Sequence, residues 1–329
     1  MQCRPLRVIV FLSAFFLFAV NTPAPLVYRP GEGWTYEPAG GGGSWTRTRA
    51  KEQLEVAQQA FDKQDYKLAT KAARRVVRIW PFSDYAPDAQ YLVGRSHEER
   101  GQDEKAFKAY QTLVEKYPKA SKYDDVVVRQ YEIANRYLAG QWFKLWGVIP
   151  FFPSMDKTVQ MYEKLIKNGP YSEVAPQAQM NIGTAREKQS DYPAAVKAYE
   201  AAADRYHDRK EVSADAIYKA GLAYLKQATT AEYDQSVAGH AIATFTDFIT
   251  LYPRDPRVPE AQKHIAALRT EQARGSLIVA RFYEKKRQWD GALVYYNEVL
   301  IRDPQSTYAE EARKRIEQIK QRTIQTAQK

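Results

Sequence analysis

A spacing of twelve residues recurs along this chain of 329 residues. In the stretch from Ser276 to Pro304, the small residue Ala280 is followed twelve residues later by Ala292 and twelve later again by Pro304. Small residues let two helices cross closely, with larger side chains filling the space beside them. A proline ends a helix because it lacks an N–H group and clashes with the preceding turn. The stretch therefore predicts two helices joined by a turn at 287–291.

The same triplet occurs at five further places. Two copies keep both steps and the proline, one has His207 in place of the proline, and two are lengthened between the small residues. These copies are Ala57/Ala69/Pro81, Gly94/Ala106/Pro118, Gly183/Ala195/His207, Ala134/Thr158/Pro170 and Gly221/Ala241/Pro253. The spacing is that of tetratricopeptide repeats, whose helix pairs need neighbours to bury their apolar faces. We expect an all-α fold, a tetratricopeptide-repeat α-solenoid of about six helical hairpins plus a C-terminal capping helix.

The N-terminal part of the chain predicts an export signal and a linker. Residues 1–24 begin with basic residues and contain an apolar run, Val8–Val20, shorter than the roughly 20 residues of a membrane-spanning helix. Residues 25–48 are rich in proline and glycine and have no helical period, which predicts an extended linker. Its aromatic residues either pack against the first helix or form a strand-like arm that docks on a partner.

The repeats should fill the rest of the chain, 49–329. We expect their bounds near 49–82, 84–119, 122–171, 173–208, 212–254 and 258–305, followed by a cap at 306–323. Between Pro253 and Ala280 there are 27 residues, whereas the junction from Pro81 to Gly94 has 13. The longer junction has no strong helix breaker, so one long helix is predicted from Val258 to about Lys286.

An apolar insertion lengthens the third repeat, between Ala139 and Ser154. It carries one charged residue and eight large apolar ones: Trp142, Phe143, Leu145, Trp146, Val148, Ile149, Phe151 and Phe152. So apolar a segment is costly to leave in water. It either folds back onto the repeats or contacts a partner protein or the membrane surface.

The charge balance is basic, with 49 Lys and Arg against 39 Asp and Glu, a net charge of +10. The basic residues are spread along the predicted helices, and many have acids three or four positions away, which favours a solvated surface. An acidic partner or an anionic lipid surface is the alternative interpretation. Nucleic acid is not expected as a partner, because export would separate the chain from it.

No motif for chemistry stands out. The glycine run Gly40–Gly43 lacks the Lys and Ser/Thr of a phosphate loop, and the four histidines lie in separate segments. His97 is expected to pack between helices and His264 to be exposed. The only cysteine, Cys3, precedes the apolar run, so neither an internal disulfide nor a lipid anchor is expected. We therefore expect no enzyme, no cofactor and no metal site.

Binding surfaces are the more plausible source of function. The first helix of each repeat lines the concave side of such an array, where extended segments can dock. Four tyrosines are candidates for that groove, although packing in the core is the alternative: Tyr91, Tyr131, Tyr218 and Tyr224. Trp142, Phe143, Trp146, Phe151 and Phe152 of the insertion complete the candidate partner-binding set.

The run from Ala241 to Pro304 resembles the outer-membrane protein assembly factor BamD family. The features that carry the resemblance are the aromatic-rich helix ending at Tyr252-Pro253, the long helix through Phe282-Tyr283, the turn at Trp289 and the helix ending at Pro304. The resemblance implies a periplasmic scaffold at the inner face of the outer membrane. Its implied partners are a BamA-like barrel assembly protein and unfolded outer-membrane proteins.

Two departures from this family are visible. Its members are normally anchored by a lipidated cysteine after the signal, whereas no cysteine follows the signal here, and only one helix follows the similar segment. Two other hypotheses stay open. One is an exported tetratricopeptide adaptor for envelope division or polysaccharide export, and the other is a regulatory module that folds onto a catalytic subunit.

Overall fold

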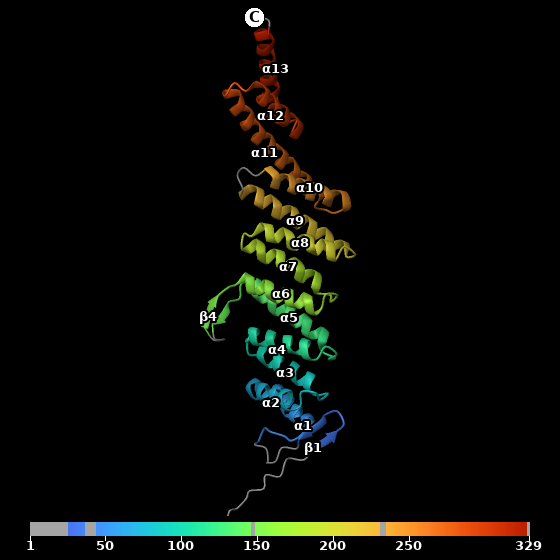
Figure 1. Ribbon diagram of the computed structural model, residues 1–329. Coiled ribbons are helices and arrows are strands. Elements are labelled where there is room, and N and C mark those ends of the chain that lie inside the picture. Colours follow the sequence, from blue (N-terminus) through green and yellow to red (C-terminus); the bar gives the residue numbers. More distant parts are fainter. Residues whose placement is uncertain (1–25, 37–43, 146–148, 231–234, 328–329) are drawn as a thin grey trace, which may run out of the picture. The chain divides into compact units, whose positions relative to one another are not determined.

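The computed structural model describes residues 26–36, 44–145, 149–230 and 235–327, and most of them are helical (Figure 1). Thirteen helices and two short antiparallel hairpins follow one another in these ranges. The fold class is all-α, of the tetratricopeptide-repeat solenoid type, as the spacing of small residues predicts. The chain divides into two compact units, residues 1–96 and 97–329.

The first unit combines a β-hairpin with helices. Its described elements are β1 (Leu26–Arg29), β2 (Gly33–Tyr36), α1 (Ala50–Asp62), α2 (Tyr66–Ile79) and most of α3 (Ala86–Glu98). The two strands are antiparallel, with Tyr28 opposite Trp34. The turn between them is held to the helical part, because the Asp84 N–H donates to the Gly31 carbonyl oxygen over 2.8 Å. Part of the segment predicted to be an extended linker is thus folded.

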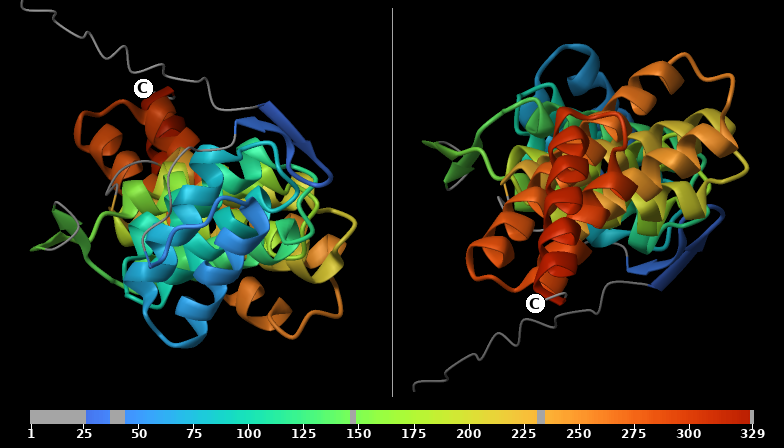
Figure 2. Two further views of the ribbon diagram at one scale, coloured as in Figure 1. Left: turned by 90° about the horizontal axis from the view of Figure 1, so that it is seen from below. Right: turned by 90° about the horizontal axis from the view of Figure 1, so that it is seen from above.

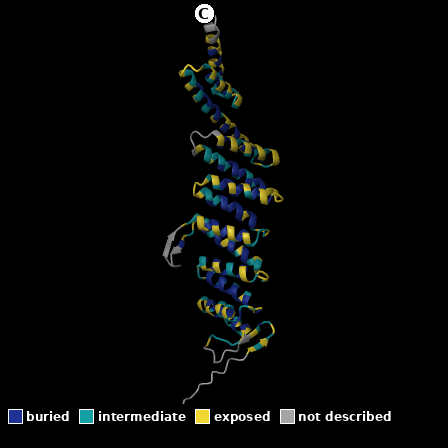
Figure 3. Ribbon diagram, viewed as in Figure 1, coloured by how far each residue is buried: buried dark blue, intermediate teal, exposed yellow. Residues whose placement is uncertain are grey.

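The second unit is a succession of helices. They are α4 (Asp103–Lys116), α5 (Tyr123–Leu138), α6 (Met155–Asn168), α7 (Ala175–Lys188), α8 (Tyr192–Arg205), α9 (Lys210–Thr230), α10 (Gln235–Leu251), α11 (Val258–Lys285), α12 (Trp289–Arg302) and α13 (Thr307–Ala327). Each packs on the next one along the chain. Buried residues lie where neighbouring helices meet, and exposed residues lie on the remaining sides (Figure 3).

The turns inside four helix pairs share one backbone feature. A single residue in each turn has positive φ, between 59° and 62°: Gln64, Gly101, Ser190 and Arg287. Each lies seven residues after the first small residue of its triplet. A left-handed residue at this place ends the first helix and redirects the chain. The repeat therefore imposes the same backbone on three residues that are not glycine.

Two of these turns also have an aspartate that begins the second helix. The Asp65 carboxylate accepts from the Leu68 N–H over 3.0 Å, and that of Asp191 accepts from the Ala194 N–H over 3.2 Å. Such a cap satisfies an N–H group that has no partner inside the helix. Pro193 lies in the first turn of α8, where its missing N–H costs little.

The small residues of the six triplets are all buried, as predicted from their spacing. Two of the three glycines among them, Gly183 and Gly221, lie under aromatic rings. A Cβ atom on Gly183 would lie 2.6 Å from Tyr199 Cδ1, and one on Gly221 would lie 2.7 Å from Phe245 Cε1. Real Cβ atoms do not approach so closely, so only glycine fits against the ring at these two positions.

Three helix pairs contain a tyrosine hydroxyl that donates to a glutamate twelve residues earlier. These Tyr–Glu pairs are Tyr110–Glu98 (2.7 Å), Tyr199–Glu187 (2.9 Å) and Tyr296–Glu284. Each glutamate also contacts a cation from a helix farther along the chain: Arg129 (3.4 Å), Lys226 (2.7 Å) and Arg315 (3.6 Å), respectively. The same polar link thus connects a helix pair with the following pair twice and with the last helix, α13, once.

The long helix predicted after Pro253 is present as α11, which runs without a break from Val258 to Lys285. Its C-terminal half packs with α12 and α13 around Leu277, Ala280 and Tyr296. The last helix, α13, contacts both α11 and α12. It therefore covers the end of the apolar core of the second unit.

The insertion between α5 and α6 contains a second antiparallel hairpin. Strand β3 (Phe143–Leu145) pairs with β4 (Ile149–Phe152), and Phe143 lies opposite Phe152. The hairpin projects to one side of α5 and α6 (Figures 1 and 2). The base of the insertion is nevertheless tied to the helices, because Phe143 is 2% exposed and stacks on Tyr137 at 4.1 Å.

Candidate protein-binding surfaces

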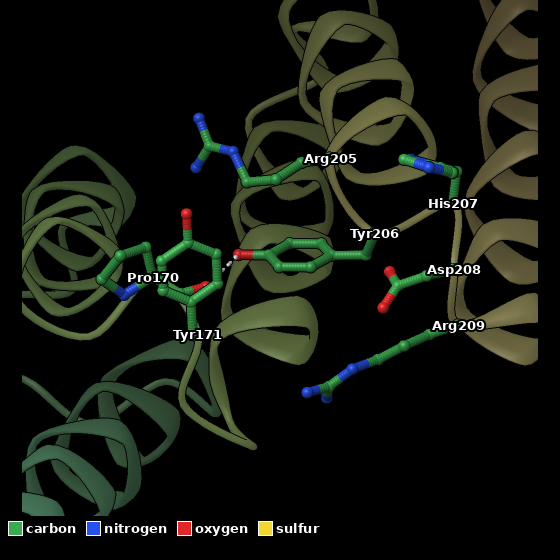
Figure 4. Close-up of a pocket in the computed structure, with 7 residues that line it drawn as sticks. All are labelled: Pro170, Tyr171, Arg205, Tyr206, His207, Asp208 and Arg209. Carbon is green, nitrogen blue, oxygen red and sulfur yellow. Dashed lines mark hydrogen bonds between the residues drawn. The ribbon is translucent and has the colours of Figure 1, made fainter.

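A cavity of about 430 Å³ opens between two turns of the second unit. One turn joins α6 to α7 and contributes Pro170 and Tyr171. The other joins α8 to α9, and with the last residue of α8 it contributes five consecutive side chains: Arg205, Tyr206, His207, Asp208 and Arg209 (Figure 4). The repeat brings the two turns together, because both follow the second helix of a pair.

Local hydrogen bonds hold the first turn in place. Pro170 follows the end of α6, and the Ser172 hydroxyl donates to the Gly169 carbonyl oxygen over 2.8 Å. The buried Tyr206 reaches across from the second turn, and its hydroxyl donates to the Pro170 carbonyl oxygen at 3.4 Å. Tyr171 is left 93% exposed, so its ring is available at the rim of the cavity.

Two guanidinium groups flank this contact. Arg205 and Arg209 lie on opposite sides of the Tyr206 ring, and both extend toward the end that carries the hydroxyl (Figure 4). Neither forms an ion pair with any carboxylate in the described part of the chain. Arg209 only donates to the Glu173 carbonyl oxygen, at 3.5 Å. Asp208 contributes one negative charge to the same cavity.

A second cavity of about 430 Å³ adjoins the first, because Pro170 and Arg205 line both. Its other lining residues come from α6 and α7: Glu163, Ile166, Lys167, Gln179 and Ile182. Ile166 and Ile182 are almost fully buried and form an apolar floor. We name the two cavities together the Arg205 groove. It offers three cations, an apolar floor and an exposed aromatic ring.

The Tyr206 hydroxyl stays protonated and can therefore act as a hydrogen-bond donor. Burial raises the pKa of its hydroxyl, while the positive charges of Arg205 and Arg209 act in the opposite direction. Because burial is the larger effect, the hydroxyl stays protonated near neutral pH. Tyr206 therefore orders the groove by donating to Pro170 and is not an ionised nucleophile.

The four tyrosines proposed for a concave groove all contact other side chains of the chain. Tyr218 is buried against Phe245 and Phe248, which agrees with the core alternative. Tyr224 is half-buried, stacks on His240 at 5.6 Å and donates to Glu200 over 3.1 Å.

The other two tyrosines are also half-buried. The ring of Tyr131 lies 6.2 Å from that of Tyr162, and its hydroxyl accepts from Asn181 at 3.5 Å. The Tyr91 hydroxyl, in the first unit, accepts from Arg95 at 3.5 Å. The use of these four tyrosines as partner anchors stays a prediction.

The candidate residues of the insertion differ in how far they are exposed and in which element they belong to. Trp142 is 51% exposed, whereas Phe143 beside it is buried against Tyr137. Phe151 and Phe152 belong to β4. Trp146 falls outside the described residues. Both hypotheses for the insertion therefore keep support, because its base packs on the helices while Trp142 faces solvent.

The histidines differ in how far they were predictable. His97 is buried, with its Nδ1 2.8 Å from Gln102 Oε1, as expected for a residue packed between helices. The prediction of an exposed His264 is wrong. Its ring stacks on Phe245 at 5.3 Å and is half-buried, because α11 packs its first half on α10.

Several exposed apolar side chains on α10 to α12 were not predicted from the sequence. They are Leu251, Ile278, Phe282, Val294 and Ile301. In α12, a buried stripe of Ala292, Tyr296 and Val299 runs beside a second, exposed pair, Val294 and Ile301, seven residues apart. A second apolar stripe on one helix is a signal that could have found this surface.

Of the helices described, none combines the length and apolar character needed to cross a membrane. Within the same residue ranges, no three His, Cys, Asp or Glu side chains gather as metal ligands do.

Comparison with protein-family models gave two matches. The model described as YfiO, outer membrane lipoprotein, matches residues 153–329, which is more than half of the chain. A tetratricopeptide-repeat model matches residues 88–120. No curated protein matches the sequence.

Solved structures that resemble the chain include other repeat proteins. The C-terminal part of a TPR repeat-containing protein from Cytophaga hutchinsonii is 15% identical over 80% of this chain and 87% of that one, with a TM-score of 0.35. A tetratricopeptide repeat protein from Parabacteroides merdae is 13% identical over 82% and 98%, with a TM-score of 0.34. MamA from Desulfovibrio magneticus is 12% identical over 63% and 97%, with a TM-score of 0.32. These likenesses say nothing about what the chain binds.

Proposed function

Because the chain belongs to the YfiO family of outer membrane lipoproteins, we propose that it is a non-catalytic scaffold of outer-membrane protein assembly. It acts in the periplasm, at the inner face of the outer membrane. Its partners are a BamA-like barrel assembly protein and unfolded barrel precursors. The family match over residues 153–329 carries this proposal, and the tetratricopeptide fold supports it because such repeats act by holding other proteins.

The exposed apolar side chains of α11 and α12 are the proposed contact for the assembly partner. They lie inside the matched region, and Phe282 is 56% exposed. Ile278 and Phe282 lie four residues apart on α11, so they share one face of the helix. Solvent-exposed aromatic and aliphatic side chains that gather on neighbouring helices commonly mark protein contacts.

Affinity purification from envelope membranes in mild detergent, followed by mass spectrometry, tests the function. We expect a barrel-forming assembly protein to co-purify in stoichiometric amounts. A clean preparation that contains no such protein would contradict the proposal. Recovery dominated by division or polysaccharide-export machinery would instead support an adaptor for those processes.

A pair of variants tests the surface. Phe282→Glu should weaken partner recovery, with a cost of about 2 kcal/mol or more if Phe282 is an anchor of the interface. Phe82→Glu is the matched control, because Phe82 is 96% exposed but lies outside the matched residues. Equal loss in both variants would argue against a specific contact on α11.

A further inference from the structure

We propose that the Arg205 groove binds an acidic peptide segment that carries an aromatic side chain. The proposal concerns a different surface from the apolar residues of α11 and α12. It does not rest on the assembly role of the family, because it follows from the charges and shape of the groove alone.

The cations of the groove are the first observation. Lys167, Arg205 and Arg209 line it, and none of them forms an ion pair with any residue that the structure describes. Two other cations of the same unit are paired with a carboxylate. Arg186 pairs with Asp156 at 2.7 Å, and Lys226 pairs with Glu187 at 2.7 Å. The groove thus collects positive charges that the fold leaves without a carboxylate.

The placement of the two arginines favours carboxylates as ligands. Both extend toward the same end of the Tyr206 ring, and the Tyr206 hydroxyl bonds to Pro170 between them (Figure 4). A planar guanidinium group can donate two parallel hydrogen bonds to one carboxylate. The carboxylates of Glu163 and Asp208 also line the groove, so three cations face two anions and the net charge is +1. An acidic segment would fit this balance, and a basic one would not.

The apolar residues of the groove favour a ligand that carries an apolar group as well as negative charge. Ile166 and Ile182 form the floor of one cavity, and Tyr171 stands at the rim of the other, 93% exposed. A simple anion would leave these surfaces unused. An aromatic side chain of a peptide can stack on Tyr171 or enter the cavity, where such contacts add binding energy beyond the buried area. Arg205, which lines both cavities, would bind the peptide between its apolar and acidic parts.

Fluorescence anisotropy with the full chain in mild detergent tests the proposal. The probe is a short labelled peptide of alternating glutamate and phenylalanine, and the matched probe has lysine in place of glutamate. The parent chain should bind only the acidic probe, and added salt should weaken this binding. The double variant Arg205→Gln/Arg209→Gln should bind it about tenfold more weakly.

Two control variants separate the groove from general surface charge. Lys197→Gln removes an exposed cation from α8 outside the groove and should leave the affinity unchanged. Tyr171→Ser should weaken binding of the phenylalanine probe about threefold, but not that of a probe with alanine in place of phenylalanine. Circular dichroism of each variant checks that the helices are intact.

Three outcomes would overturn the proposal. The first is equal binding of the acidic and basic probes, and the second is equal affinity of the parent and the double arginine variant. In the third, the acidic probe does not bind while vesicles of anionic phospholipid bind with the same dependence on Arg205 and Arg209. That result would assign the groove to lipid headgroups instead.

Discussion

The helix pairs α7–α8 and α9–α10 bury an aromatic ring over a glycine in the same way but are linked to their neighbours differently. In the first, the ring of Tyr199 covers Gly183, its hydroxyl donates to Glu187, and Glu187 pairs with Lys226 of α9. In the second, the ring of Phe245 covers Gly221. Having no hydroxyl, Phe245 stacks on His264 of α11 instead.

The difference extends to the residue four positions after each glycine. Glu187 stands there in α7, and Leu225 stands there in α9. The chain therefore matches a tyrosine with a glutamate and a phenylalanine with a leucine. The ring over the glycine is demanded by the close approach of the two helices. The link to the next helix pair can be polar or apolar, provided that the ring residue and the residue four positions after the glycine change together.

Removing the ring should have the largest effect. Phe245→Ala should lower the free energy of unfolding by about 4 kcal/mol, because it opens a cavity against Gly221, Tyr218 and His264. Urea denaturation measures the change. Phe282→Ala, at an exposed position, is the control and should cost far less. Similar losses in both would show that the ring over the glycine is not a special contact.

Filling the space under the ring should have the next largest effect. Gly183→Ala should destabilise the protein by about 2 kcal/mol, because the new methyl group collides with the buried Tyr199 ring. Gly239→Ala is the matched control in α10, where a Cβ atom meets nothing within 4 Å. That change should stabilise by about 0.5–1 kcal/mol through helix propensity. Thermal unfolding of the two variants should move in opposite directions.

Exchanging the polar Tyr199–Glu187 link and the apolar Phe245–Leu225 combination should change the free energy of unfolding less, but it tests the comparison more directly. Tyr199→Phe should cost about 1 kcal/mol, because it removes one hydrogen bond to Glu187. Phe245→Tyr should also destabilise, since Leu225 cannot accept from the new hydroxyl. Adding Leu225→Glu to Phe245→Tyr should recover part of the loss, as a double-mutant cycle would measure. Strict additivity of the two changes would show that the pairs are not coupled.

The smallest expected effect concerns alkaline pH. Burial raises the pKa of the Tyr199 hydroxyl, and the Glu187 carboxylate adds to the rise. The unfolded chain releases this proton near pH 10 while the folded chain keeps it, so the stabilisation is present below pH 10 and is lost as pH rises toward the folded pKa. At pH 10.5 the parent should lose about 0.8 kcal/mol that Tyr199→Phe does not lose. Denaturation of both proteins at pH 8 and pH 10.5 measures the difference, and parallel losses would contradict it.

Much of the fold was visible in the pattern of small residues. The steps between Ala280, Ala292 and Pro304 indicate a close crossing and a helix end, and the structure buries both alanines. The Tyr–Glu pairs were also readable, because a glutamate follows the first small residue by four positions and a tyrosine follows it by sixteen in three repeats. The β3–β4 hairpin was not predicted, since an apolar run without a period does not distinguish a strand from a buried loop.

The candidate surfaces were harder to predict. The Arg205 groove joins two turns about 35 residues apart, and its lining residues share no motif. His264 was expected to be exposed. The sequence of α11 does not reveal that Phe245, from α10, stacks on the His264 ring. Sequence spacing describes which residues share a helix face, but not which side chain of another helix covers that face.

The sequence by itself determined the repeat, its helix pairs, the crossing glycines and alanines, and the family to which the chain belongs, because helix crossing and termination depend on residues at short, regular spacing. Only the tertiary structure decided where charge and apolar surface stay uncovered. Whether Arg205, Tyr171 or Phe282 finds a partner within the chain depends on contacts between helix pairs, and those contacts join residues that the spacing of one repeat does not relate.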